Sequence, residues 1–232
     1  MKRFFNLLTG LNPNYRNEQQ EQRRCALLQR LKETHDLHTQ QCILDKMMSD
    51  DLLREANLSE LKLQDVHLEG ANLEQSQLNR ATLQNVDLEG ANLKSACLNG
   101  ANLKYADLVN ANLLEADLSH VDLEGATLTG ARLIGAKLPY ACLVHASLYE
   151  AELEGASLDH ADLQGCCLRY ANLSKATLHG ARFDEATVLP DGEKWTPTTD
   201  LRRFTDTTHP QFVSYKGQDS PAFNVRNGSA AD

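Results

Sequence analysis

The stretch Ala101-Asn102-Leu103-Lys104-Tyr105-Ala106-Asp107-Leu108-Val109-Asn110-Ala111-Asn112-Leu113-Leu114-Glu115 repeats the unit Ala-Asn/Asp-Leu-x-x three times in succession. The unit runs from Ala56 to Val188, 27 times, without an inserted or deleted residue. Its third position is Leu in the first 25 units and then Phe183 and Val188, and its first position is Ala in 21 units. The fold is predicted from this register.

The apolar residues of the unit are spaced by two and then by three. A helix alternates three and four, and a flat strand repeats every two. A step of two keeps both side chains on one face of an extended segment, so the step of three requires a corner. Gly recurs at the fifth position and Asn or Asp at the second, and both favour turns. The pattern predicts an all-β solenoid in which neighbouring units bury one another's apolar faces.

Residues 101–115, with tandem matches over more than half of the chain, resemble the pentapeptide repeat family. The resemblance implies a right-handed, quadrilateral parallel β-helix with four units per coil, whereas the five-residue period alone leaves the number of sides open. At twenty residues per coil, the 27 units give about seven coils and a rod on the order of 32 Å long. The segment after the repeats resembles tails of cyanobacterial members of the family.

Residues 1–50 form a separate N-terminal segment that is predicted to be helical. Glu18 to Lys32 is rich in strong helix formers, and a second helical pattern precedes the repeats, with a break at Thr34 to Thr39. The apolar residues of the two patterns are Leu27, Leu28, Leu31, Ile43, Leu44, Met47, Met48, Leu52 and Leu53. The segment either covers the first coil as a cap or binds a partner as a helical hairpin.

Residues 51–190 hold the repeats, and residues 191–232 follow them. Pro190-Asp191-Gly192 is a turn signal, and Trp195 is suited to close the last coil. Beyond about Asp206 the chain is polar and is expected to be mobile.

The charge of the chain is concentrated in the repeats. Residues 1–50 hold 8 Lys/Arg and 6 Asp/Glu, residues 51–190 hold 10 and 20, and residues 191–232 hold 5 and 6. Direct binding of nucleic acid is not expected, because it requires a basic face.

An acidic rod also resembles those family members that mimic DNA on type II topoisomerases. DNA carries one charge per ~1.7 Å of its axis, so a ~32 Å rod would need roughly 19 negative charges. The repeats carry a net of 10, their central position is Phe only at Phe183, and no loop interrupts them. A DNA-mimic inhibitor or protector of gyrase is therefore the alternative function and not the first.

No apolar stretch is long enough for a membrane helix, and the apolar run near the N-terminus is too short for a signal peptide. The six cysteines show no Cys-x-x-Cys spacing. A cytoplasmic protein is expected. A weak membrane contact through Phe4, Phe5, Leu7 and Leu8 is the alternative, and it is not favoured.

The sequence contains no pattern of an active site. No nucleophile with an oriented base, no phosphate-binding Gly-rich loop and no set of metal ligands is present, so catalytic residues, cofactors and metals are all expected to be none. A protein without a cleft acts through its surface.

Two groups of outward residues are the candidate interaction surface. Val109, Leu114, Ile134 and Tyr149 occupy the outward fourth position on neighbouring coils, and clustered apolar residues mark contact surfaces. With four units per coil, residues twenty apart stand in one column, which brings together His120, Tyr140 and His160. The sequence predicts a non-enzymatic interaction or scaffold module that binds a protein partner or a second copy of itself. Ordinary surface residues are the alternative interpretation of both groups.

Overall fold

A computed structural model describes residues 13–215, and the side chains from residue 18 onward. The chain divides into two compact units, Met1–Leu52 and Leu53–Asp232, which are described separately. The alternative of a membrane contact through Phe4, Phe5, Leu7 and Leu8 concerns residues outside the described part, as does the end of the tail. Between residues 13 and 215, no helix is both long and apolar enough to cross a membrane.

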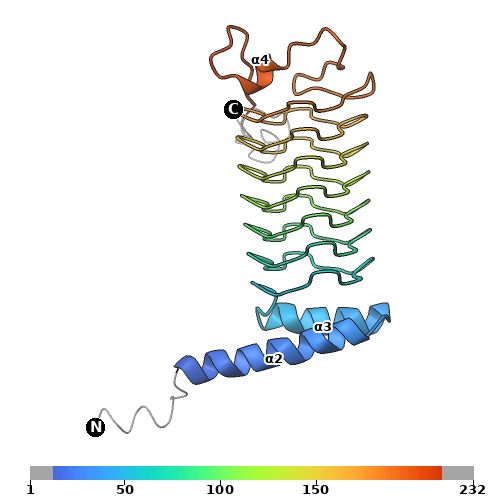
Figure 1. The fold of residues 1–232 in the computed structure, drawn as a ribbon, viewed down its shortest axis with the longest axis vertical. Helices are drawn as coiled ribbons and strands as arrows, with labels where there is room; N and C mark the ends of the chain where they lie inside the picture. Colours follow the sequence, from blue (N-terminus) through green and yellow to red (C-terminus); the bar gives the residue numbers. More distant parts are fainter. Residues whose placement is uncertain (1–12, 216–232) are drawn as a thin grey trace, which may run out of the picture. The chain divides into compact units, whose positions relative to one another are not determined.

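From residue 13 onward, the first unit contains the helices α2 (Pro13–Glu33) and α3 (Leu37–Ser49), drawn in blue in Figure 1. The expected break at Thr34 to Thr39 is shorter in the structure, because α3 already begins at Leu37. Asp36 caps this helix by accepting hydrogen bonds from the backbone amide of Thr39 at 2.8 Å and from its hydroxyl at 2.7 Å. The hydroxyl bond in particular lowers the pKa of Asp36. Arg23 of α2 pairs with Asp50, the C-cap of α3, at 3.0 Å.

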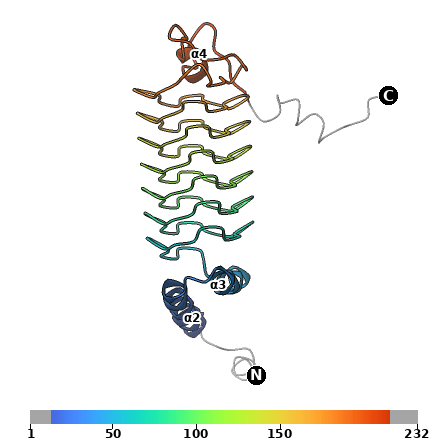
Figure 2. The ribbon, with the colours of Figure 1, turned by 90° about the vertical axis from the view of Figure 1, so that its right-hand side faces the viewer.

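The second unit is a stack of coils in which residues twenty apart lie side by side. Parallel bridges join Asn57 to Gln77, Gln77 to Cys97 and so on through the repeats. The coils appear as evenly spaced layers in Figure 1 and, turned by 90°, in Figure 2. Each bridge is isolated, so the short strands expected from the sequence are single bridging residues at the second position of the unit.

Backbone hydrogen bonds connect each coil to the next at every unit. The amide of Leu103 donates to the carbonyl of Asp122 at 2.7 Å, and that of Asn102 donates to Ala81 at 2.9 Å. The third-position carbonyl accepts from the amide three residues later, as in Ala106 to Leu103 at 3.1 Å, which closes the turn. The first and third positions point inward: Ala131 and Leu133 are 0% exposed, like most of their equivalents.

The corners place the fifth position of the unit in the left-handed region of the backbone. Glycine adopts it as expected, for example Gly125 at φ +66°. Among the described residues, sixteen fifth-position residues of the repeats other than glycine, from Glu60 to Lys175, also adopt a positive φ, for example Tyr140 at 58°. The stacking therefore imposes this conformation on ordinary residues at a cost in local strain.

The last coil breaks the five-residue register, which corrects the expectation of an unbroken run to Val188. Cys167 pairs with Val188, 21 residues later, whereas the preceding pairs lie twenty apart. Val188 therefore occupies a bridging position and not the inward third position. Thr187 and Leu189, which are 0% and 2% exposed, take the two inward positions.

The carboxylate of Asp184 accommodates the extra residue. Its Oδ1 accepts hydrogen bonds from the amides of Gly165 at 2.8 Å, Thr187 at 3.0 Å and Ala186 at 3.1 Å, and from the Thr187 hydroxyl at 3.0 Å. In the coil below, the equivalent amide, that of His145, donates to the backbone carbonyl of Gln164 at 2.9 Å. The Asp184 side chain thus replaces a carbonyl where the register slips. These bonds, first that of Gly165, lower the pKa of Asp184.

We expect Asp184→Ala to lower the midpoint of thermal unfolding at pH 7, because the amides of Gly165 and Ala186 lose their acceptor. A lowered pKa in the folded state means that the stabilisation is complete above the ordinary value of 3.8 and is lost as the pH falls through the folded pKa. The difference between parent and variant should therefore shrink below about pH 4. Glu185→Ala, at the exposed neighbouring residue, is the control. Equal midpoints for the two variants would contradict the role of Asp184.

A hairpin follows the last coil. Val188 pairs antiparallel with Lys194, and the turn between them has Gly192 at φ +85°, as the Pro190-Asp191-Gly192 signal indicated. Trp195 stacks on Phe183 with ring centroids 6.0 Å apart.

The short helix α4 (Arg202–Thr205) then takes the place of a further coil at one corner. The amide of Lys175 donates to the carbonyl of Thr205 at 2.8 Å, and Phe204 is 1% exposed. The chain was expected to be mobile beyond Asp206, but residues up to 215 contact the repeats: Ser214 lies 3.1 Å from Ser174 between their hydroxyls, and the Tyr215 ring lies 5.6 Å from that of Tyr170.

Candidate interaction surface

The outer surface of the repeats consists of columns of residues spaced by twenty. The second position forms the middle of each side, and the fourth and fifth positions form the corner turns. Asn and Asp at the second position accept a hydrogen bond from the backbone amide two residues later, as Asp107 does from Val109 at 2.9 Å. Asn92 and Asn112 also join neighbouring coils through their side chains at 3.0 Å. Hydrogen bonds of both the backbone and the side chains therefore hold the residues of each column in place.

Val109, Leu114, Ile134 and Tyr149, from here on the apolar patch, lie in two of these columns. Val109 and Tyr149 stand two coils apart in one corner, and Leu114 and Ile134 stand on neighbouring coils in the next corner. The two corners flank one side of the solenoid, whose middle carries Asn112 and Arg132. All four patch residues are partly exposed. The Tyr149 ring also contacts Tyr170 edge to face at 5.5 Å.

His120, Tyr140 and His160, from here on the aromatic column, are stacked as the twenty-residue spacing predicts. The ring centroids of His120 and Tyr140 lie 5.1 Å apart, and those of Tyr140 and His160 lie 5.0 Å apart with planes 7° from parallel. His179 continues the column edge to face at 5.6 Å from His160. Tyr140 remains 56% exposed. Stacking covers the ring faces, so the column presents ring edges to solvent.

Tyr105 and His145, in the next corner, do not stack. Gly125 separates them, and a Cβ at Gly125 would lie 2.6 Å from the Tyr105 ring. The ring therefore occupies the space that a side chain at residue 125 would need, and any larger residue would displace it.

All six cysteines are free, and one of them is buried. Cys166 is fully buried, and burial raises the pKa of its thiol. Burial likewise raises the pKa of Cys142. Within the described part of the chain, no three His, Cys, Asp or Glu side chains are grouped so that they could hold a metal ion.

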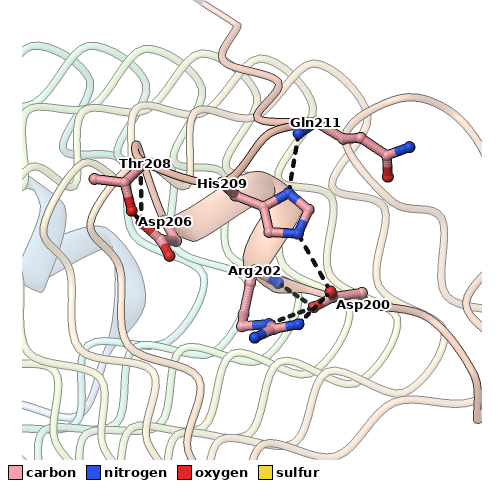
Figure 3. Close-up of polar contacts among 6 residues, drawn as sticks. All are labelled: Asp200, Arg202, Asp206, Thr208, His209 and Gln211. Carbon is pink, nitrogen blue, oxygen red and sulfur yellow. Dashed lines mark hydrogen bonds and ion pairs between the residues drawn. The ribbon is translucent and has the colours of Figure 1, made fainter.

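A polar cluster in the C-terminal segment was not anticipated from the sequence (Figure 3). Asp200 accepts hydrogen bonds from Arg202 Nη2 at 2.7 Å and Nε at 2.9 Å, and His209 Nε2 lies 3.4 Å from the same carboxylate. Arg202 above all lowers the pKa of Asp200. The other ring nitrogen of His209 accepts from the amide of Gln211 at 3.2 Å. These contacts hold the loop after α4 in place.

Comparison with known proteins identifies the repeats. The family model described as "Pentapeptide repeats" matches in eight copies, over residues 56–94, 96–133, 116–155, 128–165 and 156–187. HetL, a pentapeptide repeat protein involved in heterocyst differentiation regulation in the cyanobacterium Nostoc sp. strain PCC 7120, is 33% identical; the match covers 61% of this chain and 76% of that chain, with a TM-score of 0.23.

Two further solved structures are similar. A pentapeptide repeat protein from the thylakoid lumen of Arabidopsis thaliana is 28% identical, with 40% of this chain and 69% of that chain covered and a TM-score of 0.36. QnrB1, a plasmid-mediated fluoroquinolone resistance protein, is 17% identical over 77% of this chain and 86% of that chain, with a TM-score of 0.49. The comparison with curated proteins finds no match.

Proposed function

The chain belongs to the pentapeptide repeat family, and from this premise we propose that it is a non-enzymatic interaction or scaffold module that binds a protein through its outer faces. The observation that carries the proposal is the apolar patch. Its four residues gather partly exposed apolar side chains at two adjoining corners, and they lie on columns that backbone hydrogen bonds hold in register. A pre-formed surface of this kind binds without a large cost of ordering. The aromatic column is the second candidate contact.

The finer architecture belongs to the same proposal. It comprises a right-handed, four-sided rod of about seven coils, a helical segment in residues 1–50 that caps the rod or binds a partner, and residues 191–232 as the closing segment. We place the protein in the cytoplasm, since the six cysteines are free and thiols persist in a reducing compartment.

We expect the double substitution Leu114→Glu with Ile134→Glu to weaken association while the fold is retained. Both side chains lie in corner turns and are partly exposed, so a carboxylate at either position stays in water. In the complex the same carboxylates would be buried without a partner. The measurement compares the proteins that tagged parent and tagged variant retain from an extract of the source organism, together with self-association of each.

The matched control is Gln64→Glu with Gln84→Glu, which occupies the same position of the unit on neighbouring coils at the opposite corner. A partner of the apolar patch should be lost with the first variant and kept with the second. If the Leu114→Glu and Ile134→Glu variant retains every partner and self-associates as the parent does, the apolar patch is not the contact surface.

A DNA-mimic inhibitor of gyrase is the second candidate, because residues 51–190 hold 20 acidic residues against 10 basic ones. Ion pairs between coils interrupt this charge: Lys104 pairs with Glu124 at 2.6 Å, Arg182 with Asp162 at 2.9 Å, and Arg132 with Glu152 at 3.3 Å. A continuous phosphate-like surface would lack such pairs. A gyrase supercoiling assay with added protein separates the two functions, and inhibition that persists in the apolar-patch variant would favour DNA mimicry.

A further inference from the structure

Charged residues flank the apolar patch at both ends of its two columns. When either column is reversed, its acidic end faces the basic end of the original. From coil to coil, the first corner column reads Glu89, Val109, Thr129, Tyr149, Arg169. The next corner column reads Lys94, Leu114, Ile134, Glu154. The residue that follows each column member donates its backbone amide to the carbonyl of the column member one coil later, for example Gly130 to Tyr149 at 2.9 Å and Glu115 to Ile134 at 3.0 Å. Both columns are therefore in register. One column is acidic at its beginning and basic at its end, and the other has the opposite order.

A twofold axis in the plane of this side and perpendicular to the stacking direction reverses both columns. In the first column, it places Glu89 against Arg169 of a second copy, and Val109 against Tyr149. In the second column, it places Lys94 against Glu154 and Leu114 against Ile134. The axis that pairs the first column would pass at the height of Thr129, and the axis that pairs the second would pass midway between Leu114 and Ile134. These two heights differ by five residues, or about 1.2 Å, because twenty residues rise by one strand spacing. A single axis therefore satisfies both columns.

The corner itself permits close approach under the same axis. Gly130, which has no side chain, lies next to the centre of the first column. The axis also places Gly90 against Tyr170, so that the largest side chain of this corner meets one of the smallest residues. Asn110 meets Glu150, an amide donor against a carboxylate. Small residues thus lie where bulky ones would keep two copies apart.

Of the four charges at the ends of the patch, Glu154 pairs with Lys175 at 2.7 Å, and the antiparallel order adds Lys94 to this pair. Among the ion pairs of the described residues, none includes Glu89, Lys94 or Arg169. Glu89 and Arg169 are exposed, and Arg169 lies 5.0 Å from the Tyr170 ring centroid. In the middle of the side, Arg132 is already paired with Glu152 at 3.3 Å, so no unbalanced charge lies at the centre.

We propose that the partner of the apolar patch is a second copy of this chain, docked antiparallel on this side. The inference rests on the proposed function and names the occupant of its surface. A parallel dimer on this side would place each column against the other, so it would pair Glu89 with Lys94 but leave Arg169 against Ser174 and Glu154 against Tyr149, whereas the antiparallel order gives all four charges an opposite charge. Five coils are only about 19 Å tall, which makes the contact smaller than the ~800 Å² per partner of a standard interface. The dimer is therefore weak and depends on concentration.

Charge reversal tests the antiparallel order directly. In sedimentation velocity of the full chain over a concentration series, Glu89→Arg and Arg169→Glu should each weaken dimerisation by at least about tenfold, because each creates two like-charge contacts per dimer. The double variant should restore it to within about threefold of the parent, because opposite charges meet again. Arg80→Glu, an exposed residue at the opposite corner, is the matched control and should leave dimerisation unchanged. Circular dichroism of each variant verifies the fold.

A second measurement identifies the contact without a substitution. A carbodiimide joins only groups in direct contact, and Lys94 and Glu154 of one chain lie three coils, about 14 Å, apart. A Lys94 to Glu154 crosslink found only in the dimer band therefore supports the antiparallel dimer. A parent that stays monomeric up to about 1 mM, near the weak limit of specific association, or a double variant as weak as the single ones, would overturn it. The loss of other partners with Leu114→Glu and Ile134→Glu would then still support the proposed function, so the two failures are distinguishable.

Discussion

Phe204→Ala is expected to lower the free energy of unfolding by about 3–5 kcal/mol. Phe204 is 1% exposed although it belongs to a helix of only four residues, α4. The carbonyl of the next residue, Thr205, accepts the amide of Lys175 that would otherwise reach a further coil. Removing the ring leaves a cavity at the end of the stack, and α4 is too short to hold its position without it. Urea unfolding followed by the fluorescence of Trp195, the only tryptophan, measures the change.

Phe212→Ala is the matched control for Phe204, because Phe212 lies in the same segment but is partly exposed. Its loss should be clearly smaller, since less apolar area leaves water there on folding. The variant lacking the Phe204 ring should also aggregate more readily, because the uncovered last coil presents unpaired backbone groups. Equal losses for the two variants would show that Phe204 does not close the stack.

Leu133→Ala should destabilise the middle of the stack by about 2–5 kcal/mol. Leu133 is 0% exposed, and Leu113 and Leu153 in the coils below and above it are 1% and 0% exposed. The bridges of Arg132 to Asn112 and to Glu152 fix the backbone on both sides of Leu133, so the coils cannot collapse into the cavity. The change is measured by urea unfolding with circular dichroism as the readout.

Leu114→Ala provides the same substitution at the next outward position. Leu114 is partly exposed, so the expected loss is well below that of Leu133→Ala. A Leu114→Ala variant that is as unstable as Leu133→Ala would mean that the inward and outward positions of the unit have been assigned wrongly.

The interior of the repeats could be predicted from the sequence because two apolar residues recur in every unit. Ala131 and Leu133 both point inward. They are two residues apart, and a step of two in an extended segment keeps both side chains on one face. The number of sides could not be derived in this way. The period of five requires a corner, but it does not say after how many corners the chain closes on itself, and only the resemblance to the family indicated twenty residues per coil.

The slip at the last coil could not be derived from the pattern. Val188 fits the third position by its apolar character, yet Thr187 and Leu189 are the buried residues there. A threonine hydroxyl is normally assigned to the surface, but that of Thr187 bonds to the carbonyl of Leu163 at 3.0 Å and to Asp184. Local hydrogen bonding outweighed the apolar spacing.

The closing segment was predicted only in part. Pro190-Asp191-Gly192 identified the turn by its own chemistry, and Trp195 does contact the last repeats through Phe183. Phe204 was missed, because one aromatic residue in a polar segment carries no periodic signal. Likewise, the start of α3 depends on the single side chain of Asp36.

The candidate surface followed from the sequence once the twenty-residue register was assumed. The aromatic column needs only that register, since identical positions on successive coils must lie about one strand spacing apart. The apolar patch was identified as outward, but its partial burial and its position at two corners of one side required the structure. The reversed order of its flanking charges becomes visible only when the columns are aligned.

The twenty-residue register is the basis of every surface described above, and a carbodiimide crosslink in the monomer tests it most directly. Lys104 Nζ lies 2.6 Å from Glu124, twenty residues later, and Lys175 Nζ lies 2.7 Å from Glu154. Peptide mapping of the treated full chain at low concentration should find Lys104 joined to Glu124 or Asp122, and Lys175 joined to Glu154. Crosslinks from Lys104 to carboxylates one or two units away, such as Glu115, with none to residues 122–124, would contradict the four-unit coil and with it the arrangement of the surface.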